Sequence, residues 1–226
     1  MKPIIGILAR PSKSLNDNDC LIIEEYYKNS ILNSGGIPFM VVPPQGVSFY
    51  SVSKEELKPM TDKEKEDYDR ILSICDGILI PGSTRVYEYD SYALKYAMDK
   101  NIPVLGICAG MQLMARIDTD FKNELIDEEN SHYVEADIAH KVSISPNTLL
   151  HSIIGCDEIE VNSYHKYKVP SCGNNKICAM CGDIIEAIEN DNYKFFLGVQ
   201  WHPERLKNEY GKKIFDYFTQ VSKKIH

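Results

Sequence analysis

The chain has no hydrophobic run long enough to cross a membrane. A membrane-spanning helix needs roughly 18 to 20 consecutive apolar residues, and no segment of the 226 residues reaches that length. Residues 1–8 also lack the long apolar core and the cleavage site of a secretory signal peptide. We therefore expect a cytoplasmic protein with no membrane partner.

Positive charge is scarce as well. The chain has 25 lysine and arginine residues against 33 aspartate and glutamate residues, which gives a formal net charge of −8. Because nucleic acids attract proteins largely through their phosphates, this balance argues against a nucleic-acid partner. There is also no internal repeat, low-complexity tract or linker. We therefore predict a single domain over residues 1–226.

The cysteines lack the pairing that zinc sites and disulfide frameworks need. Their number, seven, is odd, and without a secretion signal it argues against a disulfide framework. Cys178 and Cys181 have C-x-x-C spacing, but no second pair follows at the distance typical of zinc sites. On the strand predicted for residues 176–181, positions three apart face opposite sides. We therefore predict no metal site.

What the sequence does have is a cysteine between two glycines. Residues 104–107 form a short apolar run that is typical of a buried strand, and residues 111–117 have helical composition. Gly106 and Gly110 flank Cys108 at this junction, and glycine tolerates the sharp turn that the junction requires. This arrangement predicts a nucleophile elbow, in which the thiol lies beside the first N–H groups of a helix.

A candidate base stands far downstream. Pro203 favours an extended conformation for His202, and in an extended chain His202 and Glu204 point the same way. Glu204 can then orient the imidazole while the other ring nitrogen faces the thiol.

Alternating strand and helix patterns predict the fold. We expect a flavodoxin-like, doubly wound α/β fold with a mostly parallel sheet, helices on both faces, and chemistry at the carboxyl ends of the strands. Residues 118–137 are expected to form an acidic, solvated loop. The predicted strands cover residues 4–9, 38–42, 77–80, 104–107, 140–144, 158–161 and 195–199, and the predicted helices cover 22–33, 61–73, 87–99 and 208–221.

Four motifs resemble those of a known family. Residues 76–83, 106–112, 161–165 and 198–204 are similar, in this order, to motifs of class I glutamine amidotransferase-like proteins. The segment 161–165 resembles the γ-glutamyl hydrolase, or peptidase C26-like, branch. The resemblance implies roles for the following residues: Cys108 as nucleophile, His202 as base, Glu204 as its orienting residue, the backbone of Gly82, Ser83 and Ala109 as oxyanion hole, and Gln112, Ser163, Tyr164 and His165 as substrate-binding residues.

The resemblance implies an enzyme that needs no cofactor. We expect a cysteine-dependent hydrolase that cleaves a small γ-glutamyl amide to glutamate and an amine. A glutaminase subunit that delivers ammonia to a partner synthase is an alternative, and so is a binding protein on the same scaffold. The oligomeric state is left open, with a homodimer as one option.

Some positions depart from the family pattern. Ser83 replaces the second glycine of a Pro-Gly-Gly loop, Lys166 replaces a second histidine, and residues 115–120 replace a segment that often contains Gly-Gly. Lys166 adds a cation, so we expect neutral or anionic leaving groups to be preferred over polyamines. His140 and His151 are expected in strands or loops near the surface. A histidine alone does not indicate a functional site.

Overall fold

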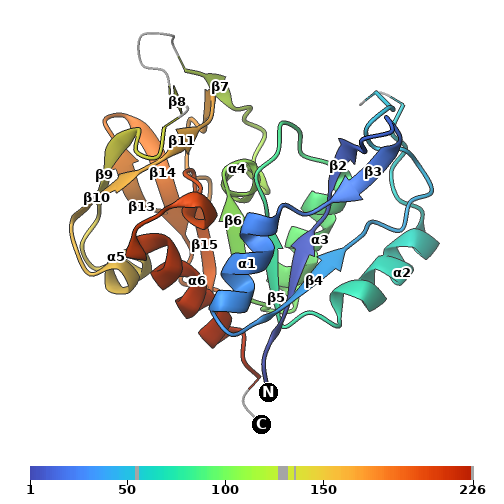
Figure 1. Ribbon diagram of the computed structural model, residues 1–226, viewed down its shortest axis with the longest axis horizontal. Coiled ribbons are helices and arrows are strands. Elements are labelled where there is room, and N and C mark those ends of the chain that lie inside the picture. The colour runs from blue at the N-terminus through green and yellow to red at the C-terminus, as the bar shows by residue number, and fades with distance from the viewer. Residues whose placement is uncertain (54–55, 127–131, 135, 225–226) are drawn as a thin grey trace.

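The computed structural model describes residues 1–53, 56–126, 132–134 and 136–224. Its main feature is a nine-stranded sheet in the order β10-β9-β13-β14-β15-β6-β5-β1-β4, with two-stranded pairs β11-β8, β12-β7 and β2-β3 beside it. Figure 1 shows the sheet between helices that lie on both of its sides. The strands are β1 Ile4–Leu8, β2 Arg10–Lys13, β3 Asp19–Ile22, β4 Ile37–Val41, β5 Gly77–Ile80, β6 Val104–Ile107, β7 Glu124–Leu125, β8 Tyr133–Val134, β9 His140–Ile144, β10 Glu158–Val161, β11 Ser163–Tyr164, β12 Tyr167–Lys168, β13 Lys176–Cys181, β14 Ile184–Glu189 and β15 Phe196–Val199.

The helices form two layers, one on each face of the sheet. Buried side chains of α1, α5 and α6 pack with Ile7 and Leu105 in one hydrophobic core. Those of α2, α3 and α4 pack with Ile78 and Ile80 in a second core on the opposite face. The helices are α1 Glu25–Asn33, α2 Asp62–Leu72, α3 Glu88–Asp99, α4 Ala109–Arg116, α5 Leu149–Ile154 and α6 Glu209–Val221, and a 3₁₀ turn, η2, covers Pro203–Arg205.

Strand direction divides the sheet. Every pairing from β4 to β15 is parallel, whereas the pairings from β15 outward to β10 are antiparallel. Only β14 and β9 therefore run against the other seven strands of this sheet. This confirms the predicted α/β class with a mostly parallel sheet. The parallel strands end at the top of Figure 1, away from the two termini, and α4 begins there.

Local sequence explains where α2 begins. The Thr61 hydroxyl accepts a hydrogen bond from the Glu64 N–H at 3.3 Å, and the Glu64 carboxylate accepts one from the Thr61 N–H at 2.7 Å. This reciprocal arrangement is a capping box, and it satisfies two backbone donors that the first turn of a helix leaves unpaired. The sequence predicted this helix start correctly.

Three segments differ from the sequence prediction. The helix predicted over residues 22–33 begins at Glu25, because Ile22 instead pairs with Arg10 in a β2-β3 hairpin that the sequence did not indicate. Residues 118–137 include the short strands β7 and β8, although a loop was expected. The acidic residues 127–129 at its centre lie outside the described residues.

Among the described residues, no helix is both long and apolar enough to cross a membrane.

Candidate active site

Cys108 lies at the junction of β6 and α4, as the elbow pattern predicts. Its backbone has φ 53° and ψ −106°, an uncommon conformation for a residue with a side chain. The Cys108 N–H donates to the Val199 carbonyl at 2.8 Å, and the Cys108 carbonyl accepts from the Gln112 N–H at 3.0 Å. The backbone on both sides of the thiol is therefore held by β15 and by the first turn of α4.

The two glycines allow this turn because their neighbours leave no room for side chains. A Cβ atom on Gly110 would collide with the Ile80 carbonyl oxygen of β5. A Cβ atom on Gly106 would lie 2.8 Å from the Gly110 carbonyl carbon, well inside van der Waals contact. Glycine at both positions thus lets α4 begin directly above the sheet with the thiol at its first turn.

His202 and Glu204 form a buried pair beside this thiol. The His202 Nδ1 atom lies 2.6 Å from Glu204 Oε1, and each residue is 7% exposed. Cys108 lies near the imidazole: a Cβ atom on Gly82 would be 2.8 Å from His202 Cε1 and 3.5 Å from Cys108 Cβ. The structure therefore brings together the three residues that the sequence predicted, in the order thiol, imidazole, carboxylate.

The charge of Glu204 changes the proton affinity of the imidazole. Burial alone would lower the pKa of His202, but the Glu204 charge and hydrogen bonds with Cys108 and Glu204 outweigh it and raise the pKa to about 10. The imidazole therefore carries its proton at neutral pH. A proton held at this position is available to a group that binds beside the thiol.

Asn162 fixes the backbone of His202, a contact that the sequence did not assign. The Asn162 amide donates to the His202 carbonyl at 2.9 Å and accepts from the His202 N–H at 2.8 Å. The ring of Tyr164 meets the imidazole edge to face, with 5.4 Å between the ring centroids. Asn162 belongs to the motif at residues 161–165, so the sequence indicates that this position is important but does not predict its contact with the His202 backbone.

The predicted oxyanion loop lies against the same imidazole. A Cβ atom on Gly82 would be 2.8 Å from His202 Cε1, so only glycine fits there. The Gly82 N–H donates to the Tyr27 hydroxyl at 3.1 Å. Ser83 is not among the described residues with positive φ, so the serine causes no backbone strain here. The oxyanion roles of Gly82, Ser83 and Ala109 stay predictions.

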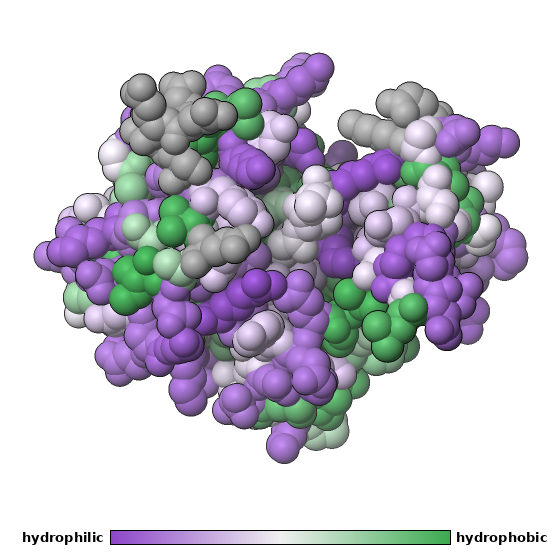
Figure 2. All heavy atoms as spheres, turned by 45° about the horizontal axis from the view of Figure 1, so that its top comes forward, coloured by the Kyte–Doolittle hydropathy of each residue, from purple (hydrophilic) through white to green (hydrophobic). Residues whose placement is uncertain are grey.

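A cavity of about 640 Å³ opens at the thiol. Cys108, Ala109, Gln112, Tyr164 and His165 contribute to its wall. It lies at the edge of the sheet where the parallel strands end. Figure 2 turns this edge toward the viewer, and its surface is mostly hydrophilic with hydrophobic residues in separate small patches.

Three cationic side chains line this cavity, and no described aspartate or glutamate does. They are Arg85, Arg116 and Lys166. Lys166 Nζ lies 5.0 Å from the centre of the Tyr133 ring. Burial lowers the pKa of Arg116, with the charge of Asp90 acting against it. The cavity is thus suited to ligands that carry negative charge.

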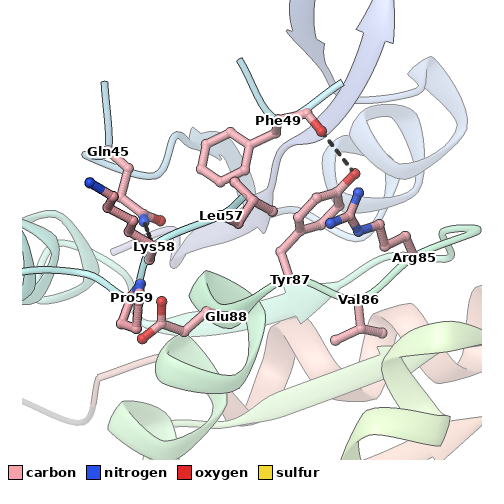
Figure 3. A pocket seen from close by; sticks show the side chains of 9 residues that line it. All are labelled: Gln45, Phe49, Leu57, Lys58, Pro59, Arg85, Val86, Tyr87 and Glu88. Atoms are coloured by element: carbon pink, nitrogen blue, oxygen red, sulfur yellow. Dashed lines mark hydrogen bonds between the residues drawn. The ribbon is translucent and has the colours of Figure 1, made fainter. Parts of the chain in front are cut away.

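Arg85 is shared with a second, smaller cavity. This cavity of about 280 Å³ includes Phe49, Tyr87 and Glu88 in its wall (Figure 3). The Arg85 guanidinium lies 5.0 Å from the centre of the Tyr87 ring and donates to the Val52 carbonyl at 3.3 Å. Arg85 therefore lines the main cavity, while Tyr87 packs on Phe49.

Two predicted substrate residues have protein partners in this structure. The Gln112 amide nitrogen donates to the Tyr167 carbonyl and to the Gln200 side chain, both at 3.0 Å. The Ser163 side chain is fully buried, and its hydroxyl donates to the His132 carbonyl. Gln112 contributes to the cavity wall and Ser163 does not. The substrate-binding roles stay predictions.

The expectation for His140 is wrong. Its side chain is only 15% exposed, and Nε2 lies 3.4 Å from Glu186 Oε1 of β14, from which β9 is separated by β13. His151 does lie near the surface, 2.8 Å from Asp157. Cys178 and Cys181 have different surroundings, since Cys178 is fully buried in one core and Cys181 lies near His140.

Comparison with known proteins places the chain in a family. The family model of Peptidase C26 matches residues 87–204, just over half of the chain. The chain belongs to the Peptidase C26 family. Within this family the chain is a glutamine amidotransferase-like domain, and the family and its relatives support an amidohydrolase.

Curated relatives include single proteins and parts of larger ones. A glutamine amidotransferase-like protein of Rickettsia prowazekii is 25% identical over 99% of both chains. The CTP synthase of Thermotoga maritima is 31% identical over 75% of this chain, which covers 39% of that enzyme. This Peptidase C26 chain therefore spans about two fifths of the CTP synthase that it matches.

Solved structures share the fold. The glutaminase domain of Trypanosoma brucei CTPS, with bound acivicin, has a TM-score of 0.68 and 18% identity, and the match covers 97% of this chain and 93% of that one. PurLQS from Thermotoga maritima has a TM-score of 0.64 and 15% identity, with 99% and 100% covered. At these identities the likeness concerns the fold alone.

Proposed function

We propose that this protein hydrolyses the γ-amide of glutamine or of a γ-glutamyl compound at Cys108. The observation that carries the proposal is the alignment of the Cys108 thiol, the His202 imidazole and the Glu204 carboxylate beside an open cavity. The glutaminase form, in which ammonia passes to a partner synthase, draws the stronger support from the comparisons, because CTP synthases and a CTPS glutaminase domain are among the similar proteins.

The proposed reaction proceeds through a thioester. With its proton on His202, the Cys108 sulfur attacks the γ-carbonyl carbon as a thiolate, and that proton passes to the leaving nitrogen as the C–N bond breaks. Water then attacks the thioester, gives a proton back to His202 and releases glutamate. Backbone N–H groups at Ala109 and in the Gly82–Ser83 loop would stabilise the oxyanion, at about 3 kcal/mol for each donor in comparable sites.

A stand-alone γ-glutamyl hydrolase is the second candidate. Arg116 and Asn123 line the same cavity of about 640 Å³ as Cys108, so there is space beside the thiol for a leaving group. Its cationic wall favours leaving groups without positive charge. This form of the proposal differs from the first only in the amine that departs and in the absence of a synthase.

Glutamate and ammonia release separate the two candidates. The purified chain and its Cys108→Ala variant are supplied with glutamine and with a panel of neutral, acidic and cationic γ-glutamyl amides. A stand-alone hydrolase turns over at least one γ-glutamyl amide much faster than glutamine. A glutaminase prefers glutamine. Equal glutamate release by the chain and the Cys108→Ala variant with every substrate would reject both.

A further inference from the structure

A second group of titratable side chains lies behind the cavity wall, outside the proposed reaction. Three imidazole nitrogens approach one carboxylate oxygen, Glu186 Oε1. His132 Nδ1 is 3.0 Å from it, His140 Nε2 is 3.4 Å, and His165 Nε2 is 3.5 Å. His132 Nδ1 and His165 Nε2 are 3.2 Å apart.

The fold assembles this group from four separate segments. Glu186 lies in β14, a strand whose residues are all buried. His140 begins β9, which is one strand away beyond β13. His132 and His165 flank the β8-β11 pair, and the His165 N–H donates to the His132 carbonyl at 3.3 Å. The side chains of these residues are 0 to 15% exposed, so the group is largely buried.

One hydrogen bond joins His132 Nδ1 and His165 Nε2 at 3.2 Å, and it leaves the carboxylate of the group without a partner of this kind. Neither carboxylate oxygen of Glu186, nor His140 Nε2, has a hydrogen bond of acceptable geometry with the described residues. A buried carboxylate without partners is strongly unfavourable, so a cation is needed at its oxygens. His132 Nδ1, at 3.0 Å, is within the 2.7 to 3.2 Å that N–H···O bonds usually span but does not form a hydrogen bond of acceptable geometry with Glu186, and His140 and His165 lie beyond that range.

The tautomer of His165 favours a metal ion over a proton. Its Nδ1 lies 3.1 Å from the Tyr167 carbonyl, which can only accept, so Nδ1 carries a hydrogen. In the neutral ring Nε2 then presents a lone pair to the Glu186 oxygen. Such a contact between ring N–H and backbone carbonyl is the usual way in which proteins orient a metal-binding histidine.

The spacings match those between the ligands of a tetrahedral ion. Zinc–nitrogen bonds of about 2.05 Å place neighbouring ligand atoms about 3.3 Å apart. The ligand atoms of His132, His165 and Glu186 all lie within 4.8 Å of one another, with spacings of 3.0, 3.2 and 3.5 Å, and His140 Nε2 adds a contact of 3.4 Å to Glu186 Oε1. Imidazole and carboxylate are donors that suit zinc. Cys181 offers a further donor, since its sulfur lies within 4.8 Å of ligand atoms of His132 and His140.

We propose that His132, His140, His165 and Glu186 form a binding site for a divalent transition-metal ion, and that zinc is the ion it takes. Binding joins β14 and β9 to the segment that contains Tyr164 and His165, which line the cavity. The ion is therefore structural, and it fixes the cavity wall without reaching the thiol. This proposal does not depend on the proposed function, because none of its four residues belongs to the Cys108, His202 and Glu204 group, although His165 also lines the cavity.

The test measures bound metal in a protein whose thiol cannot interfere. The Cys108→Ala chain is used, because a thiol and a histidine bind zinc by themselves. It is produced with zinc, dialysed against metal-free buffer and measured by mass spectrometry of the elements. We expect about one zinc per chain and a rise in Tm when zinc is added to the metal-free protein.

Two variants locate the metal. In the same background, His140→Asn should lose most of the zinc and the zinc-dependent rise in Tm. His151→Asn, at a surface histidine paired with Asp157, should keep both. If His140→Asn does not fold, cobalt added to the Cys108→Ala chain should give the visible spectrum of a tetrahedral ion with nitrogen and oxygen ligands. Absence of zinc and of any rise in Tm, or full zinc retention by His140→Asn, would overturn the proposal.

Discussion

The molecule contains two buried groups made of glutamate and histidine, and they differ in number and spacing. Glu204 faces one imidazole, His202, at 2.6 Å. Glu186 faces three imidazoles at 3.0 to 3.5 Å. The first group ends at a thiol and an open cavity, whereas the second is enclosed behind the cavity wall.

This difference indicates that glutamate and histidine side chains have different roles in the two groups. A single short contact localises one proton on His202 and raises its pKa, which suits proton transfer. Three longer contacts to one oxygen leave a space between the ligand atoms, which suits a larger cation. We therefore expect changes at Glu204 to alter the reaction and changes at Glu186 to alter stability.

The largest effect on turnover should come from replacing Cys108, whose thiol adjoins the Glu204 group and not the Glu186 group. Cys108→Ala removes the nucleophile, so turnover should fall on the order of 10⁴-fold or more, as nucleophile loss does in comparable enzymes. Circular dichroism should show an unchanged fold, because the side chain is small and borders the cavity. Cys20→Ala, at a half-buried cysteine far from the site in sequence, is the matched control and should keep full activity.

Glu204→Gln should have the next largest effect on the reaction. Turnover should fall roughly 10²- to 10³-fold, less than with Cys108→Ala, because the thiol and the oxyanion donors remain. Glu209→Gln, at an exposed carboxylate paired with Lys213, serves as control. Unchanged rates in Glu204→Gln would remove this residue from the site.

The pH profile sharpens the same prediction. The wild-type rate should decline as pH rises through about 10, because His202 then loses the proton that the leaving nitrogen needs. Glu204→Gln removes the negative charge that raises the pKa of His202, so its decline should begin at lower pH. An alkaline limb at the same pH in both proteins would contradict the role given to the Glu204 charge.

Glu186→Gln should affect stability more than turnover. Removing the charge that faces three imidazoles should lower the free energy of unfolding by about 3 kcal/mol, the usual cost of breaking a buried charged group. Urea denaturation of the zinc-loaded protein measures this. Glu158→Gln, at an exposed partner of Lys141, should change the stability little. A Glu186→Gln protein as stable as the wild type would show that the two glutamate groups do not differ in this way.

The smallest effect concerns the charge of the leaving group. Lys166 lines the cavity beside Tyr133 and is solvated, so its repulsion of a cationic amine should amount to about 1 kcal/mol or less, at most several-fold in rate. Lys166→His should narrow the preference for neutral and acidic γ-glutamyl amides over a γ-glutamyl polyamine. Lys212→His on α6 is the control. An unchanged preference would shift attention to Arg85 and Arg116.

The two groups also differ in how far the sequence predicts them. The elbow and the His-x-Glu pair depend on neighbouring residues, so Gly106, Cys108, Gly110 and the pair at 202 and 204 are visible as local patterns. The Glu186 group draws on residues 132, 140, 165 and 186, which only the folded sheet brings together. No spacing in the sequence could indicate it.

Elements of the fold that depend on long-range pairing were likewise not predictable from the sequence. Long apolar strands and helices with clear starts, such as β6 and α2, follow from their own residues. The strands β7 and β8 have two residues each and exist through pairing with β12 and β11, so no alternating pattern marks them. The β2-β3 hairpin lies in a polar segment with a proline, which obscured it in the sequence.

The most direct test of the central claim is the rate at which a glutamine-like electrophile labels each cysteine. Cys108 should be the reactive thiol because His202, whose pKa is raised by Glu204 and not by Glu186, lies beside it. Peptide mapping should find Cys108 labelled ahead of the other six cysteines. Labelling should be slowed strongly by Glu204→Gln and little by Glu186→Gln in folded protein. First labelling at another cysteine, or equal slowing by both substitutions, would contradict the account.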